Sequence, residues 1–145
     1  PSLARSMEGG LLSYCSDITL EDNPFTIGMD RLLDIDKPYD YVGKAALQKI
    51  AEHGTRRRLV GANFQGDPVR PNEHFLPVRV AGEVAGHLTR CVYSPRLQHN
   101  IALVNLPVEY AAPGTLIELD LPEGQRSAEV VALPWFPAEK KIPAW

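Results

Sequence analysis

The sequence contains few residues of the kinds that build metal sites and nucleophilic active sites. Only two cysteines and four histidines occur in 145 residues, and their spacing matches no metal-ligand pattern. There is no glycine-rich phosphate loop and no Gly-x-Ser-x-Gly motif, and Ser94 before Pro95 is typical of a turn. The sequence therefore argues against zinc, P-loop and serine-hydrolase chemistry, and we expect no metal cofactor.

The chain also lacks long hydrophobic runs and a strong charge of either sign. Its apolar runs are too short to span a bilayer, so we expect no membrane partner. A net charge of −3 gives no general attraction for nucleic acid, and the three arginines at 56–58 complement the dipole of a helix expected just before them. Cys15 and Cys91 are typical of reduced thiols in the cytoplasm, while a disulfide between them stays open.

What is present is the composition of an ordinary globular protein. Hydrophobic residues make up 44% of the chain and charged residues 23%. This length can bury a substantial core and fits one domain, or one domain with part of another.

The first 55 residues predict a mixed α+β segment. The apolar spacing over 43–53, with Gly54 after it, is typical of an amphipathic helix. Residues 11–15 suit a short strand, and 27–35 are weakly specified with strand as one possibility.

The remainder, 56–145, predicts a small barrel made only of strands. Short β-rich runs alternate with glycine and proline turns, and Ala81-Gly82 between two runs indicates a hairpin. The expected strands are 59–64, 75–80, 83–92, 101–106, 116–121 and 127–133. Several short strands at such regular spacing favour a β-barrel domain.

One carboxylate stands in an unusual place, directly before two glycines. Glu8 precedes Gly9 and Gly10, which allow close backbone approach or a positive φ. A carboxylate there could accept two N–H groups from a flat ligand edge. The alternative is a strand entering a turn, with Glu8 on its solvated face.

A series of further motifs follows in order. They are Asn23-Pro24-Phe25, Tyr41-Val42-Gly43-Lys44-Ala45-Ala46-Leu47, Arg58-Leu59-Val60-Gly61, Gly86-His87-Leu88-Thr89, Tyr93-Ser94-Pro95-Arg96-Leu97, Asn100-Ile101-Ala102 and Pro113-Gly114-Thr115. Together with Glu8-Gly9-Gly10 they resemble the tetrahydrofolate-dependent aminomethyltransferase family, the glycine cleavage T-protein and its relatives. The residues that follow Glu8, together with Asn23-Pro24-Phe25, are most similar to those of the branch that contains dimethylsulfoniopropionate demethylase and the folate-dependent demethylases.

The resemblance carries several expectations about fold and function. It implies a six-stranded Greek-key barrel preceded by the end of a folate-binding domain, and hence a C-terminal fragment of a longer enzyme. Such enzymes transfer a one-carbon group from a small substrate to N5 of tetrahydrofolate. The donor would be a methyl compound, or an aminomethyl group on a lipoyl carrier protein. Catalytic residues are expected in the preceding part of the same enzyme, so none is assigned in this chain.

The same resemblance leaves a second class open, a non-catalytic folate-binding or assembly module. Relatives of that kind carry a Lys-Gly-Cys-aromatic motif before the helix, whereas this chain has Asp40-Tyr41-Val42-Gly43-Lys44 without cysteine.

Four cofactor-binding residues are implied for tetrahydrofolate. Glu8 would hold the pterin ring, although the family's arginine two residues earlier is Ser6 here. Tyr14, an even number of residues after Glu8, would share its face on a regular strand and contact the cofactor, or else be a core or edge aromatic. Arg31 would meet the folate tail, or lie on the surface, and Lys140 would reach the cofactor. The aromatic pair before Lys140, Trp135 and Phe136, is expected to close the barrel.

Overall fold

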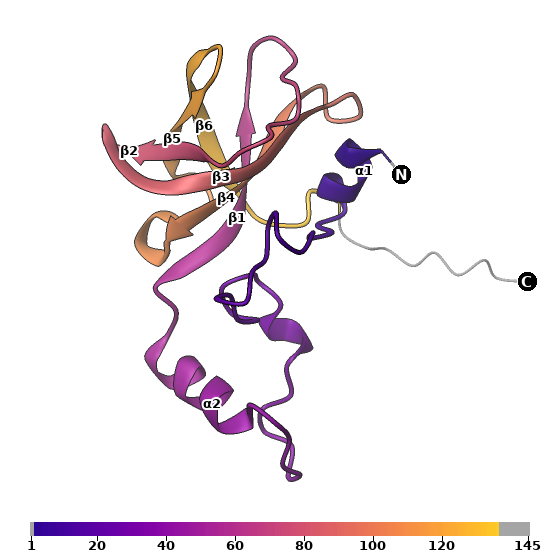
Figure 1. Cartoon of the computed structure of the whole chain (residues 1–145), viewed down its shortest axis with the longest axis vertical. Coiled ribbons are helices and arrows are strands. Elements are labelled where there is room, and N and C mark those ends of the chain that lie inside the picture. The colour runs from indigo at the N-terminus through magenta and orange to yellow at the C-terminus, as the bar shows by residue number, and fades with distance from the viewer. Residues whose placement is uncertain (1, 137–145) are drawn as a thin grey trace, which may run out of the picture.

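The computed structural model describes residues 2–136 and consists of a β-barrel with an N-terminal extension (Figure 1). Three short helices precede the barrel: α1 (Leu3–Glu8), the 3₁₀ turn η1 (Asp30–Leu32) and α2 (Lys44–His53). The barrel contains β1 (Arg57–Phe64), β2 (Leu76–Val80), β3 (Glu83–Ser94), β4 (His99–Pro107), the 3₁₀ turn η2 (Val108–Tyr110), β5 (Leu116–Leu121) and β6 (Gly124–Val131).

The six strands form one closed barrel in the order β1-β4-β3-β2-β5-β6, with every neighbouring pair antiparallel. Strands β2, β3 and β4 are consecutive in the sequence and neighbours in the barrel. The long connection after β1 leads to β2, so that β1 pairs with β4, which is a Greek-key connection. The prediction of a six-stranded Greek-key barrel is confirmed. Closure leaves no free sheet edge within the barrel.

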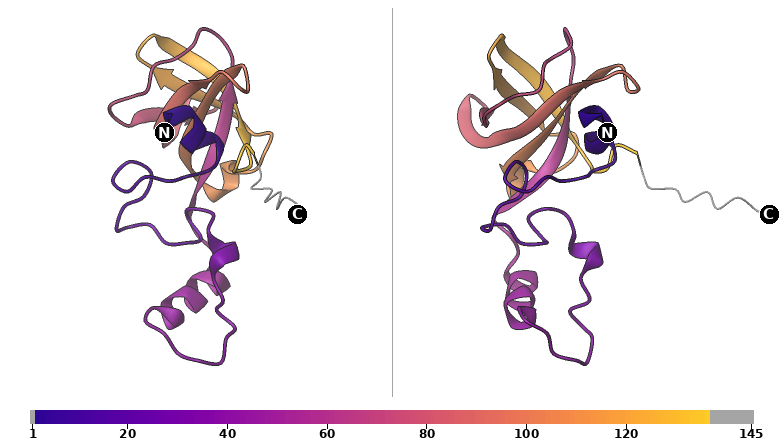
Figure 2. Two further views of the ribbon diagram at one scale, coloured as in Figure 1. Left: turned by 90° about the vertical axis from the view of Figure 1, so that its right-hand side faces the viewer. Right: turned by 45° about the vertical axis from the view of Figure 1, so that its right-hand side comes forward.

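The alternation of side chains along the strands separates two hydrophobic clusters. Inward-facing residues such as Val60, Phe64, Val78, Leu88 and Val104 fill the barrel interior. A second cluster lies on the outer face, where Met7, Leu59, Ile101 and Leu103 are buried together. Helix α1 therefore covers one outer face of the barrel, as Figure 2 shows.

The predicted hairpin at Ala81-Gly82 joins β2 and β3. Both residues have positive φ, 50° and 83°, as a tight two-residue hairpin turn requires. The hairpin is confirmed.

The expected strand at 11–15 is wrong. The chain has a positive φ at Gly10 (69°) and at Cys15 (68°), so this segment turns instead of extending. Within residues 2–136, its one contact of the β-ladder type is an isolated bridge between Tyr14 and Ile18. The strand considered for 27–35 is also not formed, and η1 occupies its centre.

Helix α2 confirms the helix expected at 43–53. It begins at Lys44 after Gly43 and ends at His53 before Gly54, which has a φ of 78°. None of its residues is buried, and Figure 1 shows it projecting away from the barrel. The segment 2–56 thus contains helices but no strand, so the β part of the predicted α+β segment is wrong. No helix within 2–136 has both the length and the apolar character to cross a bilayer.

Candidate functional site

Glu8 lies at the C-terminal end of α1 and is buried against the barrel. Only 4% of the residue is exposed, and its Oε1 accepts a hydrogen bond of 2.6 Å from the Ser94 hydroxyl at the end of β3. The same hydroxyl accepts a hydrogen bond from the Leu97 amide. Ser94 thus stabilises the turn that follows β3, as its sequence context indicates. The alternative of Glu8 on a solvated strand face is wrong, because the residue is helical and enclosed.

The last described residues of the chain lie beside Glu8. The Phe136 amide donates to the Glu8 carbonyl at 3.2 Å, and the Arg96 guanidinium sits 3.6 Å from the centre of the Phe136 ring. These contacts join the C-terminal segment to α1 and to the turn between β3 and β4. Lys140, four residues further on, lies outside the described residues.

Trp135 packs on the outer cluster under α1. Its indole nitrogen donates to Asn63 Oδ1 at 2.7 Å, and Gly61 leaves room for the ring because a Cβ there would come within 2.9 Å of it. The aromatic residue therefore covers an outer face of the barrel between β1 and α1 and does not close an end.

Tyr14 is on a loop, not on the strand that would align it with Glu8. The side chain is 63% exposed, which excludes a core role, and the loop is closed by the hydrogen bond from the Cys15 amide to the Ile18 carbonyl. Among residues 2–136, no hydrogen bond joins Tyr14 to Glu8. Whether a cofactor contacts Tyr14 stays a prediction.

A buried ion pair fixes this loop to the barrel, and sequence reasoning missed it. The Asp17 carboxylate accepts the Ser13 amide at 2.8 Å, the Thr89 hydroxyl at 2.9 Å and Arg90 Nε at 2.9 Å. Arg90 Nη2 completes the ion pair and also donates to the Leu11 carbonyl at 2.8 Å. A bulge in β3 between Leu88 and Arg90 lets both Thr89 and Arg90 reach Asp17.

Arg31 lies in η1 with an exposed side chain. Its neighbour Asp30 is 3.5 Å from the Arg58 guanidinium in an exposed pair. Nearby, a hydrogen bond with Asp34 raises the pKa of Lys37. In the described part of the chain, no hydrogen bond or ion pair joins these cations to Glu8 or Tyr14. The exposed Arg31 agrees with the surface alternative, and its role in binding the folate tail stays a prediction.

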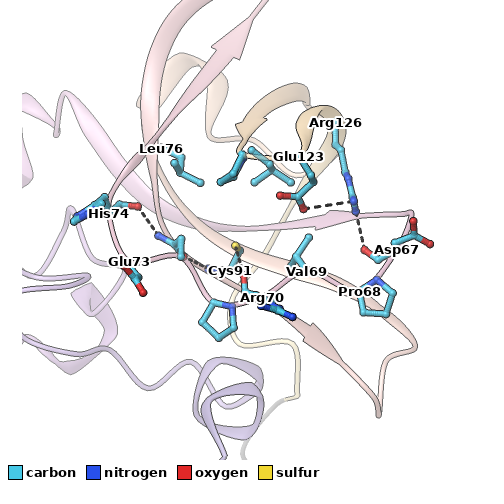
Figure 3. Close-up of a pocket in the computed structure, with 14 residues that line it drawn as sticks. Asp67, Pro68, Val69, Arg70, Glu73, His74, Leu76, Cys91, Glu123 and Arg126 are labelled. Carbon is cyan, nitrogen blue, oxygen red and sulfur yellow. Dashed lines mark hydrogen bonds and ion pairs between the residues drawn. The ribbon is translucent and has the colours of Figure 1, made fainter.

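A cavity of about 620 Å³ opens between the β1–β2 connection and the β5–β6 turn (Figure 3). Apolar side chains of Val69, Leu76 and Leu121 line it together with the Cys91 thiol, and Arg126 bridges its rim by donating to the Asp67 carbonyl at 2.8 Å. Of the predicted cofactor residues that the structure describes, neither Glu8, Tyr14 nor Arg31 lines this cavity. Residues 2–136 also contain no cluster of three side chains suited to a metal ion.

The two thiols are expected to differ sharply in reactivity. Both cysteines are free, Cys15 is exposed, and burial raises the pKa of Cys91 to about 11 while leaving 2% of the residue accessible. At pH 8 only about one Cys91 side chain in a thousand would be a thiolate, the form that reacts with an alkylating reagent. Iodoacetamide labelling followed by mass spectrometry should modify Cys15 within minutes and Cys91 only after denaturation. Equal labelling rates in the native protein would contradict this arrangement.

Comparison with known proteins agrees with this architecture. The family described as the glycine cleavage T-protein C-terminal barrel domain matches residues 57–137, which is more than half of the chain. A solved aminomethyltransferase T of the glycine cleavage system from Bartonella henselae shares the fold, with a TM-score of 0.80 at 22% identity over 92% of this chain and 37% of that one. The chain belongs to the glycine cleavage T-protein family.

Curated relatives extend the match toward the N-terminus. An aminomethyltransferase from Saccharopolyspora erythraea is 37% identical over 131 residues, and a dimethylsulfoniopropionate demethylase from Ruegeria pomeroyi is 32% identical over 130 residues. Each alignment covers 90% of this chain but 35% of the relative. The chain thus spans about a third of the length of these relatives.

Proposed function

We propose that this chain is the C-terminal part of a tetrahydrofolate-dependent methyl- or aminomethyltransferase. The observation that carries the proposal is the family match over 57–137, joined to relatives that include both an aminomethyltransferase and a demethylase. In this reaction N5 of tetrahydrofolate attacks the one-carbon group of a small donor. The protein contributes position and electrostatic stabilisation, so the residues that orient the folate ring matter most.

Glu8 is the residue of this chain that we assign to the pterin ring. Its Oε1 is occupied by Ser94, whereas Oε2 accepts no hydrogen bond from another residue within 2–136. A carboxylate anchored through one oxygen can accept a ring N–H on the other without reorganising. Ser94 is then a positioning residue, because it holds the other oxygen.

Replacing Glu8 by glutamine in the longer enzyme is expected to weaken tetrahydrofolate binding about ten- to hundred-fold, the cost of losing a charge-assisted hydrogen bond. Calorimetric titration measures the effect directly. Glu109→Gln, an exposed acid on η2, is the matched control and should bind as the wild type does. Unchanged affinity in Glu8→Gln would remove Glu8 from the pocket and leave it only its contact with Ser94.

The preceding part of the same enzyme is the partner that we propose for the N-terminal extension. Six large apolar side chains between residues 11 and 42 are exposed, and α2 buries none of its residues. The six are Leu11, Tyr14, Leu20, Leu32, Tyr39 and Val42. Such a concentration of exposed apolar surface is typical of an interface.

Folate titration of this chain and of the longer enzyme, side by side, tests the whole proposal. Binding by the longer enzyme alone would support a pocket shared between its parts, and would turn attention to the donor, a methyl compound or a lipoyl-bound aminomethyl group. No binding by a folded longer enzyme would overturn the proposal in favour of a module that keeps the fold for another task.

A further inference from the structure

Glu8 is held at two points, through its carboxylate and through its backbone carbonyl. The carboxylate accepts the Ser94 hydroxyl at 2.6 Å, and the carbonyl accepts the Phe136 amide at 3.2 Å. Helix α1 has six residues and is too short to be stable alone, so the contacts at its end decide where the Glu8 side chain points. One of these contacts comes from the C-terminal segment 133–136.

This C-terminal segment is itself anchored on the barrel and lies along the end of α1. The Trp135 indole donates to Asn63 Oδ1 at 2.7 Å and packs on the outer cluster. Pro134 lies against the chain just after Glu8, because a Cβ added at Gly10 would come within 3.1 Å of the Pro134 Cβ. The segment therefore joins a fixed part of β1 to the helix end that carries Glu8.

The turn between β3 and β4 provides both contacts at that helix end. Ser94 begins the turn, and the guanidinium of Arg96, two residues later, sits 3.6 Å from the centre of the Phe136 ring. The amides of Leu97 and Gln98 fix the turn by donating to the Ser94 hydroxyl at 3.1 Å and to its carbonyl at 2.8 Å. Arg96 is exposed, and no ion pair within residues 2–136 competes for its charge.

We propose that Arg96 and Phe136 are positioning residues for the folate site. Arg96 holds the Phe136 ring, and the Phe136 amide holds the end of α1 from which Glu8 reaches the pterin. Neither side chain has to contact folate. A carboxylate that is already ordered loses less freedom when a ligand binds, which is the gain from such positioning. The inference rests on the proposed function, because it takes Glu8 as the residue that binds the ring.

Arg96→Gln in the longer enzyme tests the link, because it removes the charge over the ring and keeps a long polar side chain. It is expected to weaken tetrahydrofolate binding about three- to tenfold in calorimetric titration, the cost of ordering one side chain on binding. Arg96→Lys keeps a cation and should restore most of the affinity. Arg70→Gln, an exposed arginine in the β1–β2 connection, is the matched control and should bind as the wild type does.

The same substitution in a Glu8→Gln background separates positioning from a general structural role. If Arg96 acts through the Glu8 carboxylate, Arg96→Gln should change the affinity of the Glu8→Gln enzyme by less than about twofold, since the group that it positions is already lost. A role in the stability of the whole barrel, or a direct contact with folate, would instead give the same loss in both backgrounds.

Hydrogen exchange of the 145-residue chain, followed by NMR, measures the hold on α1 without folate. Phe136→Leu keeps the amide and much of the apolar bulk but offers no aromatic face to Arg96. The amides of Gly9 and Phe136 should exchange at least about threefold faster in Arg96→Gln and in Phe136→Leu, while the amides of β1 and β4 keep their wild-type rates. Unchanged rates at Gly9 and Phe136 in both variants would overturn the inference.

The titrations distinguish failure of this inference from failure of the proposed function. Weak binding by Glu8→Gln with wild-type affinity in Arg96→Gln would overturn the positioning role alone. Equal losses from Arg96→Gln in the two backgrounds would do the same, because Arg96 would then act independently of Glu8. Wild-type affinity in Glu8→Gln would remove Glu8 from the pocket, and the positioning role of Arg96 and Phe136 would fall with it.

Discussion

Replacing Asp17 by asparagine is expected to lower the free energy of unfolding by about 3 kcal/mol, the lower end of the cost of breaking a buried ion pair. The Asp17 side chain is fully buried and that of Arg90 is 11% exposed, so the substitution leaves an arginine charge enclosed without its counter-ion. The remaining bond from Arg90 to the Leu11 carbonyl and its slight exposure keep the cost from being larger. Urea unfolding followed by circular dichroism measures the change.

The barrel supplies a matched control in the pair formed by Asp120 and Arg79. Arg79 Nε lies 2.8 Å from Asp120 Oδ2, but the two side chains are 34% and 26% exposed. Asp120→Asn should therefore cost much less than Asp17→Asn, as substitutions in partly solvated pairs do. Combining Asp17→Asn with Arg90→Met should recover part of the loss, because no unpaired charge remains. Equal costs for the two aspartate substitutions would contradict the burial argument.

The barrel could be predicted from the sequence because its signals are local. Each strand alternates inward and outward residues, and each is bounded by turn residues within a few positions, as Ala81 and Gly82 illustrate between β2 and β3. All six expected strands are present, with ends that differ by a few residues, such as β6 starting at Gly124 instead of 127.

Helix α1 could not be predicted because its stability does not come from its own six residues. A helix this short is not stable alone, and it forms here because Met7 is buried on the outer face of the barrel. The following Leu11 and Leu12 imitate a strand pattern, but the positive φ of Gly10 redirects the chain.

The contacts that define the candidate site are equally non-local. Glu8 and Ser94 are 86 residues apart, and Asp17 and Arg90 differ by 73 positions. Nothing in either local sequence indicates its partner. Residue types could suggest that Glu8 was special, but only the closed barrel brings it to the end of β3.

Replacing Gly86 by alanine is expected to destabilise the barrel by about 3 kcal/mol, the upper end of the cost of overpacking a core. A Cβ at this position would lie 2.1 Å from the Asn105 carbonyl oxygen, and a backbone atom cannot move aside as a flexible side chain can. The strands β3 and β4 would have to separate beside the His87–Asn105 pairing, which also carries the bonds of Arg57 to Asn105. Urea unfolding by circular dichroism again gives the free energy.

Two other glycines separate this steric cost from backbone strain. Gly9 has a φ of −81°, and a Cβ added there would have no neighbour closer than 3.5 Å. Gly9→Ala should therefore change the free energy of unfolding by no more than about 0.5 kcal/mol. At Gly82 a new Cβ would have open space, but the φ is 83°. Gly82→Ala should therefore lower the free energy of unfolding by about 1 kcal/mol through backbone strain alone. Gly86 is not in the left-handed region, so a loss that exceeds both controls must arise from the approach of the two strands. A Gly86→Ala variant no less stable than Gly82→Ala would mean that β3 and β4 can separate at little cost, and that this glycine is not required for their close contact.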